Sequence, residues 1–150
     1  MTGFVLDCSV TMAWCFSDEF NDYASSVQDA LQHTQARVPA IWYFEVANVL
    51  VVGERRARLT AEDSVAFLSL VARLPIEIVP PETADGMSNT LAIAKQTGFS
   101  AYDSAYIDLA TRENVPLATL DKSVAAAAQA FGVQLFDPMH RPDRANGGNE

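Results

Sequence analysis

Basic residues are scarce in this 150-residue chain, which has ten Lys and Arg against nineteen Asp and Glu and a formal net charge of −9. A protein that grips nucleic acid through its phosphates usually presents a basic face, so the overall charge argues against that mode of binding. Excess acid also fits a solubilising surface, a cation site or a basic partner. Where the acids lie along the chain therefore has to distinguish a solubilising surface from a cation site or a surface for a basic partner.

Cysteine, histidine and long apolar runs are also rare. Cys8 and Cys15 come without a Cys/His cluster, so they indicate reduced thiols in a core rather than a zinc site or a disulfide. His33 and His140 are isolated, so we expect both to be exposed and see no basis for a histidine base. No apolar run approaches the roughly 20 residues that span a bilayer, and the start, MTGFVLDCS, lacks the basic region of a signal peptide. We expect a cytoplasmic protein with no membrane association.

No Gly/Ser linker and no internal repeat divides the chain, and 49% of its residues are hydrophobic. This length suits one domain that buries a substantial core. We expect that domain to cover residues 1–138. The last residues, 139–150, are rich in Arg, Asn and Gly, and we expect them to form a frayed tail.

Short apolar strands alternate with helical stretches along the sequence. Strands are predicted at residues 4–7, 37–40, 76–79, 117–120 and 133–136. Helices are predicted around residues 10–15, over 18–34, within 41–59, from 60 to before 75, from 83 to 98, from 100 onward and over 124–131. Such alternation favours a three-layer α/β/α sandwich with a mostly parallel central sheet.

Two acids follow predicted strands directly. Asp7 ends the stretch FVLD and Asp121 follows LATL, so both belong at the carboxyl edge of a parallel sheet, where sites form. Each also precedes a predicted helix, where an acid commonly serves as a cap. Ser9 fits either a helix cap or a hydrogen bond to a metal-bound water, and Thr119 fits an ordinary strand threonine. Taken singly, these residues leave both interpretations open.

Two further acids lie in predicted helices. Glu45 stands in the apolar stretch WYFEVANVL, with Asn48 one turn further on the same side. An ionised glutamate in such a setting costs several kcal/mol unless it is paired, metal-bound or turned to solvent. Asp103 has capping-box spacing after Ser100, which is its structural alternative. Asp108, further along the same helix, is expected to be solvated.

The combination of these acids predicts a site that none predicts alone. Four carboxylates packed together repel one another, which raises their pKa values. A hard divalent cation relieves this repulsion, and ligation by oxygen alone suits Mg²⁺ or Mn²⁺. Such an ion can activate water and stabilise charge on a phosphoryl group. We therefore expect a metal site built from Asp7, Glu45, Asp103 and Asp121, with Ser9, Asn48 and Thr119 as polar neighbours.

The ordered set VLDCS, FEVANVL, SAYDSAYIDLA and LATLDKS resembles the PIN-domain ribonucleases, most closely the VapC-type toxins of prokaryotic toxin–antitoxin pairs. The resemblance runs from Phe4 to about Pro138. It implies that the four acids are the catalytic metal ligands and that Ser9, Asn48 and Thr119 support them. It also implies metal-dependent hydrolysis of single-stranded or looped RNA, such as tRNA or rRNA, by a homodimer that a cognate antitoxin silences.

The acidic composition departs from what an RNA-cleaving enzyme needs, because substrate phosphates call for local cations. Lys122, beside Asp121, and Arg55 and Arg56, after the Glu45 helix, are the candidates for phosphate contact, with Arg58 and Arg112 as further ones. The arginines equally fit a solvated helix end that complements the helix dipole.

Three other functions compete with a nuclease. A haloacid-dehalogenase-like phosphatase also starts with a strand that ends in an acid, but Ser9 stands where its second acid would be. A phosphoacceptor receiver domain needs an aspartate after a middle strand, which the segment 76–81 does not supply. The non-enzymatic alternative is a degenerate PIN domain that binds RNA or protein without cutting.

Overall fold

A parallel four-stranded sheet forms the centre of the molecule. The computed structural model describes residues 3–81 and 83–140. The strands are β1 (Gly3–Leu6), β2 (Gln35–Pro39), β3 (Ile76–Val79) and β4 (Leu117–Ala118), in the order β3-β2-β1-β4. Every pair of neighbouring strands is parallel. The predicted parallel sheet is therefore confirmed, with β1 in its interior.

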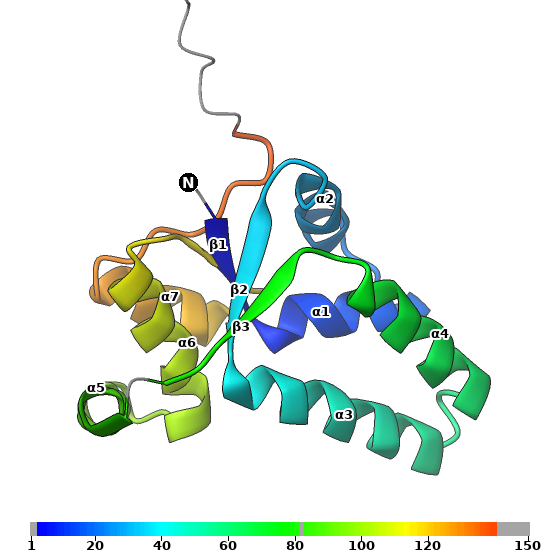
Figure 1. Cartoon of the computed structure of the whole chain (residues 1–150), viewed down its shortest axis with the longest axis horizontal. Helices are drawn as coiled ribbons and strands as arrows, with labels where there is room; N and C mark the ends of the chain where they lie inside the picture. The colour runs from blue at the N-terminus through cyan, green and yellow to red at the C-terminus, as the bar shows by residue number, and fades with distance from the viewer. Residues whose placement is uncertain (1–2, 82, 141–150) are drawn as a thin grey trace, which may run out of the picture.

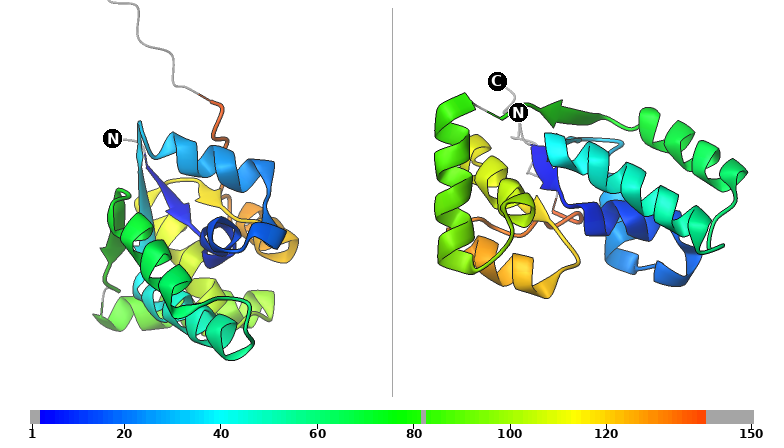
Figure 2. Two further views of the ribbon diagram at one scale, coloured as in Figure 1. Left: turned by 90° about the vertical axis from the view of Figure 1, so that its right-hand side faces the viewer. Right: turned by 90° about the horizontal axis from the view of Figure 1, so that it is seen from below.

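Helices cover both faces of this sheet (Figure 1). The helical elements are α1 (Cys8–Cys15), the 3₁₀ turn η1 (Ser17–Glu19), α2 (Asp22–Ala30), α3 (Ala40–Arg55), α4 (Ala61–Ala72), α5 (Thr83–Thr97), α6 (Ala101–Glu113) and α7 (Lys122–Ala130). In Figure 2, α5, α6 and α7 lie on one side of the sheet and α1, α3 and α4 on the other. The three-layer α/β/α architecture is thus as predicted.

The core lies where β1 meets the helices. Phe4, Val5 and Leu6 are fully buried, as are Ile107 and Leu109 of α6. A strand that is apolar at successive positions, rather than at alternate ones, is typical of a parallel sheet covered on both faces. Burial of this kind holds the carboxyl end of β1, and the residue that follows it, in a fixed place.

Local sequence explains where several helices begin. Thr60 and Asp63 form a reciprocal capping box at the start of α4, and the side chains of Asn21 and Ser100 cap α2 and α6. Each of these polar side chains satisfies a backbone N–H that the first helical turn leaves without a partner.

The structure corrects two predicted elements. The helix expected over residues 18–34 is divided into η1 and α2, because Asn21 caps a new helix and Phe20 before it is 69% exposed. The strand expected over residues 133–136 is reduced to a single parallel bridge between Leu117 and Leu135. A segment beside β4 has only two strand residues to pair with, which is too little for a regular ladder.

The structure tests some of the predictions made from composition and leaves the domain boundary untested. Cys8 and Cys15 are free thiols, Cys8 buried and Cys15 partly exposed, and His33 and His140 are exposed as expected. Within the described residues, no helix is both long and apolar enough to cross a bilayer. The expected tail, residues 139–150, lies outside the described residues from position 141 onward, so the domain boundary at 138 stays a prediction.

Candidate functional site

Asp7 is a buried carboxylate that does not cap the helix it precedes. It follows β1 and holds the N-cap position of α1, yet its side chain makes no capping hydrogen bond. Its Oδ2 instead accepts hydrogen bonds from Ser9 Oγ at 2.6 Å and from Thr119 Oγ1 at 2.8 Å. Only 7% of the residue is exposed. The capping explanation of Asp7 is therefore wrong.

Ser9 and Thr119 join the carboxyl ends of β1 and β4. Ser9 Oγ accepts a hydrogen bond of 3.0 Å from the N–H of Leu120, and Thr119 Oγ1 accepts one of 3.1 Å from the N–H of Asp121. The two hydroxyl oxygens are 3.4 Å apart. Ser9 donates to Asp7 and accepts from the segment after β4, while Thr119 donates to Asp7 across the two segments and accepts from the N–H of Asp121 in its own. The pair therefore fixes the Asp7 carboxylate relative to the loop that carries Asp121.

Asp121 does act as a helix cap. Its Oδ1 accepts from the N–H groups of Ser123 at 2.9 Å and Val124 at 3.1 Å, at the start of α7. The residue is exposed. Both of these hydrogen bonds go to one oxygen, so the capping role occupies only half of the carboxylate.

Asp103 is not part of a reciprocal capping box. Ser100 Oγ accepts a hydrogen bond of 3.2 Å from the N–H of Asp103, which caps α6. The second bond of a capping box, from the N–H of Ser100 to the Asp103 carboxylate, does not accompany it. The Asp103 side chain is exposed on the first turn of α6. The backbone N–H of Asp103 therefore takes part in capping α6, whereas its carboxylate does not and can contact another group.

Glu45 is held by a residue that the sequence did not suggest. Its Oε1 accepts a hydrogen bond of 2.7 Å from the hydroxyl of Tyr106, which lies on α6. Glu45 is half-buried, and the expected neighbour Asn48 is exposed. The feature of the sequence that could have predicted a role for Tyr106 is its position three residues after Asp103, because that spacing puts both residues on one side of α6.

The charges of the four acids influence the pKa values of Asp7 and Glu45. Burial raises the pKa of Asp7, the hydrogen bonds from Ser9 and Thr119 oppose this rise, and the charges of Asp103 and Asp121 add to it. Burial likewise raises the pKa of Glu45 against the hydrogen bond from Tyr106, and the charges of Asp7 and Asp103 add to that rise. Repulsion between neighbouring carboxylates is expected where they share a site.

The four acids come close enough to affect one another without forming a finished ligand cage. Over residues 3–81 and 83–140, no group of three or more His, Cys, Asp or Glu side chains is arranged to hold a metal ion. Within the same residues, the side-chain hydrogen bonds to Asp7, Glu45 and Asp121 each go to a single carboxylate oxygen. The second oxygen of each is left for another contact.

Comparison with known proteins places this chain in a family. The family model described as the PIN domain matches residues 4–130. The chain belongs to the PIN domain family. No curated protein matches it.

Solved structures share this PIN fold at low sequence identity. PAE2754 from Pyrobaculum aerophilum is 18% identical with a TM-score of 0.65, over 84% of this chain and 79% of that one. FitAcB from Neisseria gonorrhoeae is 19% identical with a TM-score of 0.63, over 92% and 99%. VapBC2 from Rickettsia felis, bound to a DNA fragment from its promoter, is 12% identical with a TM-score of 0.64, over 89% and 96%.

The basic residues expected to contact phosphate differ in whether they are already paired. Lys122 begins α7 beside Asp121, and Arg55 and Arg56 end α3, all three exposed. Arg58 is instead 3.1 Å from Asp18 and its guanidinium lies 4.0 Å from the centre of the Phe16 ring. Lys122, Arg55 and Arg56 thus remain the candidates for a substrate phosphate.

Arg112 and Asp108 pair with each other inside the PIN domain. Arg112 Nε donates to Asp108 Oδ2 at 2.9 Å, and Asp108 is only 6% exposed. The expectation that Asp108 is solvated is wrong, because the arginine one turn later on α6 provides the counter-charge that burial requires. Arg112 is therefore a structural partner rather than a free cation.

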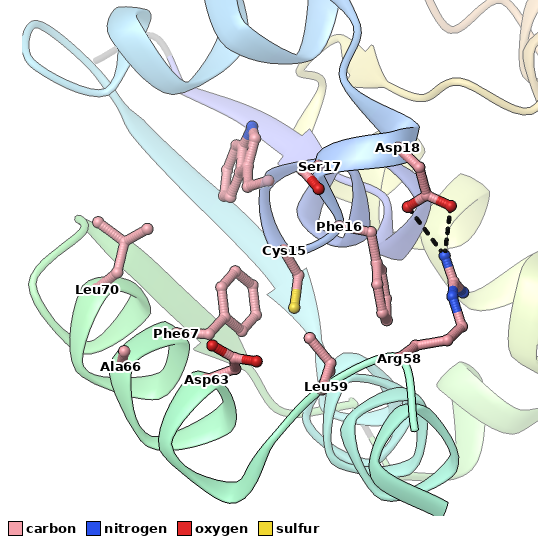
Figure 3. A pocket seen from close by; sticks show the side chains of 11 residues that line it. Cys15, Phe16, Ser17, Asp18, Arg58, Leu59, Asp63, Ala66, Phe67 and Leu70 are labelled. Carbon is pink, nitrogen blue, oxygen red and sulfur yellow. Dashed lines mark hydrogen bonds and ion pairs between the residues drawn. The ribbon is translucent and has the colours of Figure 1, made fainter. Parts of the chain in front are cut away.

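A groove of about 620 Å³ lies apart from the acids of this PIN domain. It runs between α1, η1, the loop after α3, and α4, and its lining contains none of the four acids. Figure 3 shows the side chains of Cys15, Phe67 and Leu70 around it, with Asp63 nearby. The groove thus offers both apolar and charged side chains on the face opposite α5, α6 and α7.

Proposed function

We propose that this PIN domain is a metal-dependent endoribonuclease that hydrolyses RNA phosphodiester bonds. The observation that carries the proposal is Asp7, a buried carboxylate that caps nothing and whose pKa is raised by burial and by the charges of Asp103 and Asp121. Keeping such a group ionised costs stability, so a role other than folding has to account for it. Membership of the PIN family supports nuclease chemistry.

The donor set fits a hard divalent cation. Asp7, Glu45, Asp103 and Asp121 offer only carboxylate oxygens, which Mg²⁺ and Mn²⁺ prefer, and their mutual repulsion falls when a cation lies between them. Bound there, Mg²⁺ or Mn²⁺ would activate water and stabilise the charge that develops on a phosphoryl group. The four carboxylates are therefore the proposed ligands.

The protein's own groups set the positions of these carboxylates. Ser9 and Thr119 hold one oxygen of Asp7, and the first N–H groups of α7 hold one oxygen of Asp121. We propose that Asn48, exposed one turn after Glu45 on the same helix, supports the site beside Glu45.

We infer that exposed cations beside an otherwise acidic site receive the RNA phosphates. Lys122 directly follows Asp121, while Arg55 and Arg56 lie at the far end of the helix that carries Glu45. Phosphate contacts position a nucleic acid without reading its sequence. On this proposal Lys122 bears most of the contact near the scissile bond.

The proposal extends to a cytoplasmic toxin that acts on tRNA or rRNA as a homodimer. FitAcB, VapBC2 and a toxin–antitoxin complex from Klebsiella pneumoniae all share the fold, which supports a cognate antitoxin as partner. The match to the PIN family replaces the haloacid-dehalogenase-like alternative. The degenerate, non-cutting PIN domain remains the competing function.

Cleavage of RNA decides between the nuclease and the non-cutting domain. Purified protein is incubated with total RNA in Mg²⁺, Mn²⁺ or EDTA, alongside Asp7→Asn, Asp103→Asn and the control Asp29→Asn, an exposed acid on α2. We expect cleavage by the wild type and the control only, and only with metal. If Asp7→Asn cuts RNA as well as the wild type, the proposed four-acid site is wrong. If the wild type binds RNA but neither it nor any variant cuts it, the degenerate, non-cutting domain is supported.

We propose the groove beside α4 as the place where the antitoxin docks. Its apolar side chains fit an apolar segment of a partner, and Asp63 in its lining fits a basic residue. The product of an adjacent small gene should co-purify with the wild type and with Ala72→Arg, an exposed position of α4 outside the groove lining. It should be lost from Ala66→Arg, in the lining, while RNA cleavage is kept; equal capture by both variants would place the partner elsewhere.

A further inference from the structure

Tyr106 is an almost fully buried phenol whose one polar atom is directed at an acid of the candidate site. The residue is 1% exposed, and its hydroxyl donates to Glu45 Oε1 at 2.7 Å. We propose that Tyr106 is a positioning residue, which holds the Glu45 carboxylate in the orientation that ligates the metal. This inference rests on the proposed function and assigns a role that the four acids and their supporting hydroxyls do not fill.

The direction of the hydrogen bond follows from the chemistry of the two groups. An ionised carboxylate has no proton to donate and only accepts, so the phenolic hydroxyl of Tyr106 is the donor and Glu45 Oε1 is the acceptor. A buried donor of this kind leaves the glutamate one free oxygen, Oε2, in a fixed place.

Tyr106 also links two helices that carry different acids. Glu45 belongs to α3, whereas Tyr106 and Asp103 stand three residues apart on α6. The hydrogen bond spans 61 residues of sequence. Because a helix fixes the spacing between Asp103 and Tyr106, the hydrogen bond sets the position of Glu45 relative to Asp103 as well.

A glutamate whose side chain rotates freely would be a weaker metal ligand than one held in a fixed orientation. Glu45 is only half-buried, so without the hydrogen bond from Tyr106 its long side chain would be free to rotate toward solvent. Hydrogen bonds from groups outside the ligand set commonly orient metal ligands, and losing one typically costs 10–100-fold in metal affinity or activity. Ser9 and Thr119 do this for Asp7, and the geometry assigns Tyr106 the same task for Glu45.

The experiment compares two tyrosines with the same kind of bond. Tyr23 is the matched control, because its hydroxyl donates to the backbone oxygen of Phe136 at 2.8 Å. Tyr106→Phe and Tyr23→Phe each remove one hydroxyl and its hydrogen bond. For the wild type and both variants, Mn²⁺ binding is titrated by electron paramagnetic resonance, the melting temperature is measured in EDTA, and RNA cleavage is followed against Mn²⁺ concentration.

We expect Tyr106→Phe to weaken Mn²⁺ binding by about tenfold and to raise the Mn²⁺ concentration for half-maximal cleavage in parallel. Tyr23→Phe should change neither quantity, although both variants should lower the melting temperature in EDTA. A purely structural role for Tyr106 predicts that it affects only the melting temperature.

Wild-type Mn²⁺ affinity in Tyr106→Phe would overturn the positioning role and leave the nuclease proposal standing. If the wild type itself binds no Mn²⁺ and cuts no RNA, the proposed function is overturned and the role of Tyr106 falls with it.

Discussion

Thr119 Oγ1 donates a hydrogen bond of 2.8 Å to Asp7 Oδ2 across 112 residues of sequence. The same hydroxyl accepts from the N–H of Asp121. One side chain therefore connects the acid after β1 to the acid after β4. The two acids lie at the same edge of the sheet because β1 and β4 are parallel neighbours.

Removing this hydroxyl should disturb both acids together. Thr119→Val keeps the shape of the side chain but takes a donor from Asp7 and an acceptor from the N–H of Asp121. We expect RNA cleavage to fall by about 10–100-fold and the free energy of unfolding by about 1–3 kcal/mol. Thr111→Val is the control, because the Thr111 hydroxyl donates to the Ile107 carbonyl within α6. Cleavage at the wild-type rate by Thr119→Val would show that the link is only structural.

Neutralising Asp7 should stabilise the metal-free protein. Burial raises the pKa of Asp7 above its ordinary value of 3.8, so between these two pH values the folded state holds more protons than the unfolded state. The free energy of unfolding therefore falls as the pH rises through this window, and it stays lower above it. In urea unfolding at pH 7 in EDTA, we expect the free energy of unfolding of Asp7→Asn to exceed that of the wild type on the order of 1 kcal/mol. This difference should shrink as the pH falls through the window and should be lost below pH 3.8.

Metal should reverse this order of stability. Mn²⁺ at 100 times its dissociation constant should stabilise the wild type by about 2.7 kcal/mol and leave Asp7→Asn unchanged. A wild type that is more stable than Asp7→Asn in EDTA would contradict the desolvation of Asp7. An equal response of both proteins to Mn²⁺ would contradict its role as a ligand.

Two aspartates on α6 should separate activity from stability. Asp103→Asn changes an exposed carboxylate and keeps the capping N–H, so its free energy of unfolding should stay within about 0.5 kcal/mol of the wild type. Its cleavage should fall by more than about 100-fold, since even groups outside a ligand set change activity 10–100-fold.

Asp108→Asn should do the opposite. It leaves the Arg112 charge without its partner, and Arg112 is partly exposed, so we expect a loss of about 1–3 kcal/mol with cleavage per folded molecule retained. Urea unfolding and RNA cleavage of both variants test the contrast. Loss of cleavage by folded Asp108→Asn would extend the site along α6.

The two cysteines should differ in reactivity. Burial, with the charges of Glu45 and Asp7, raises the pKa of the Cys8 thiol to about 12, whereas Cys15 is only half-buried at the groove. The thiolate is the reactive form, so a disulfide reagent at pH 8 should label Cys15 at least about tenfold faster than Cys8. Mass spectrometry of the wild type and of Cys15→Ser measures both rates. Equal labelling would mean that the region around Cys8 opens readily.

Local pattern was enough to predict most of the fold. The apolar stretch at residues 4–6 and the alternation of strands and helices predicted a parallel sheet, because a strand covered on both faces needs apolar residues at successive positions. The division of the helix expected over residues 18–34 was not predicted. It depends on Asn21 leaving the helical conformation to cap α2, and the apolar spacing does not reveal that choice.

The sequence by itself determined which residues are candidates for the site, since the order of Asp7, Glu45, Asp103 and Asp121 is readable along the chain. It left open whether each acid caps a helix or serves another purpose. Only the tertiary structure decided that Asp121 caps α7 and Asp7 caps nothing. A cap is a contact within a few residues, whereas the partners of Asp7 and Glu45 include Thr119 and Tyr106, which reach them only after distant segments have packed together.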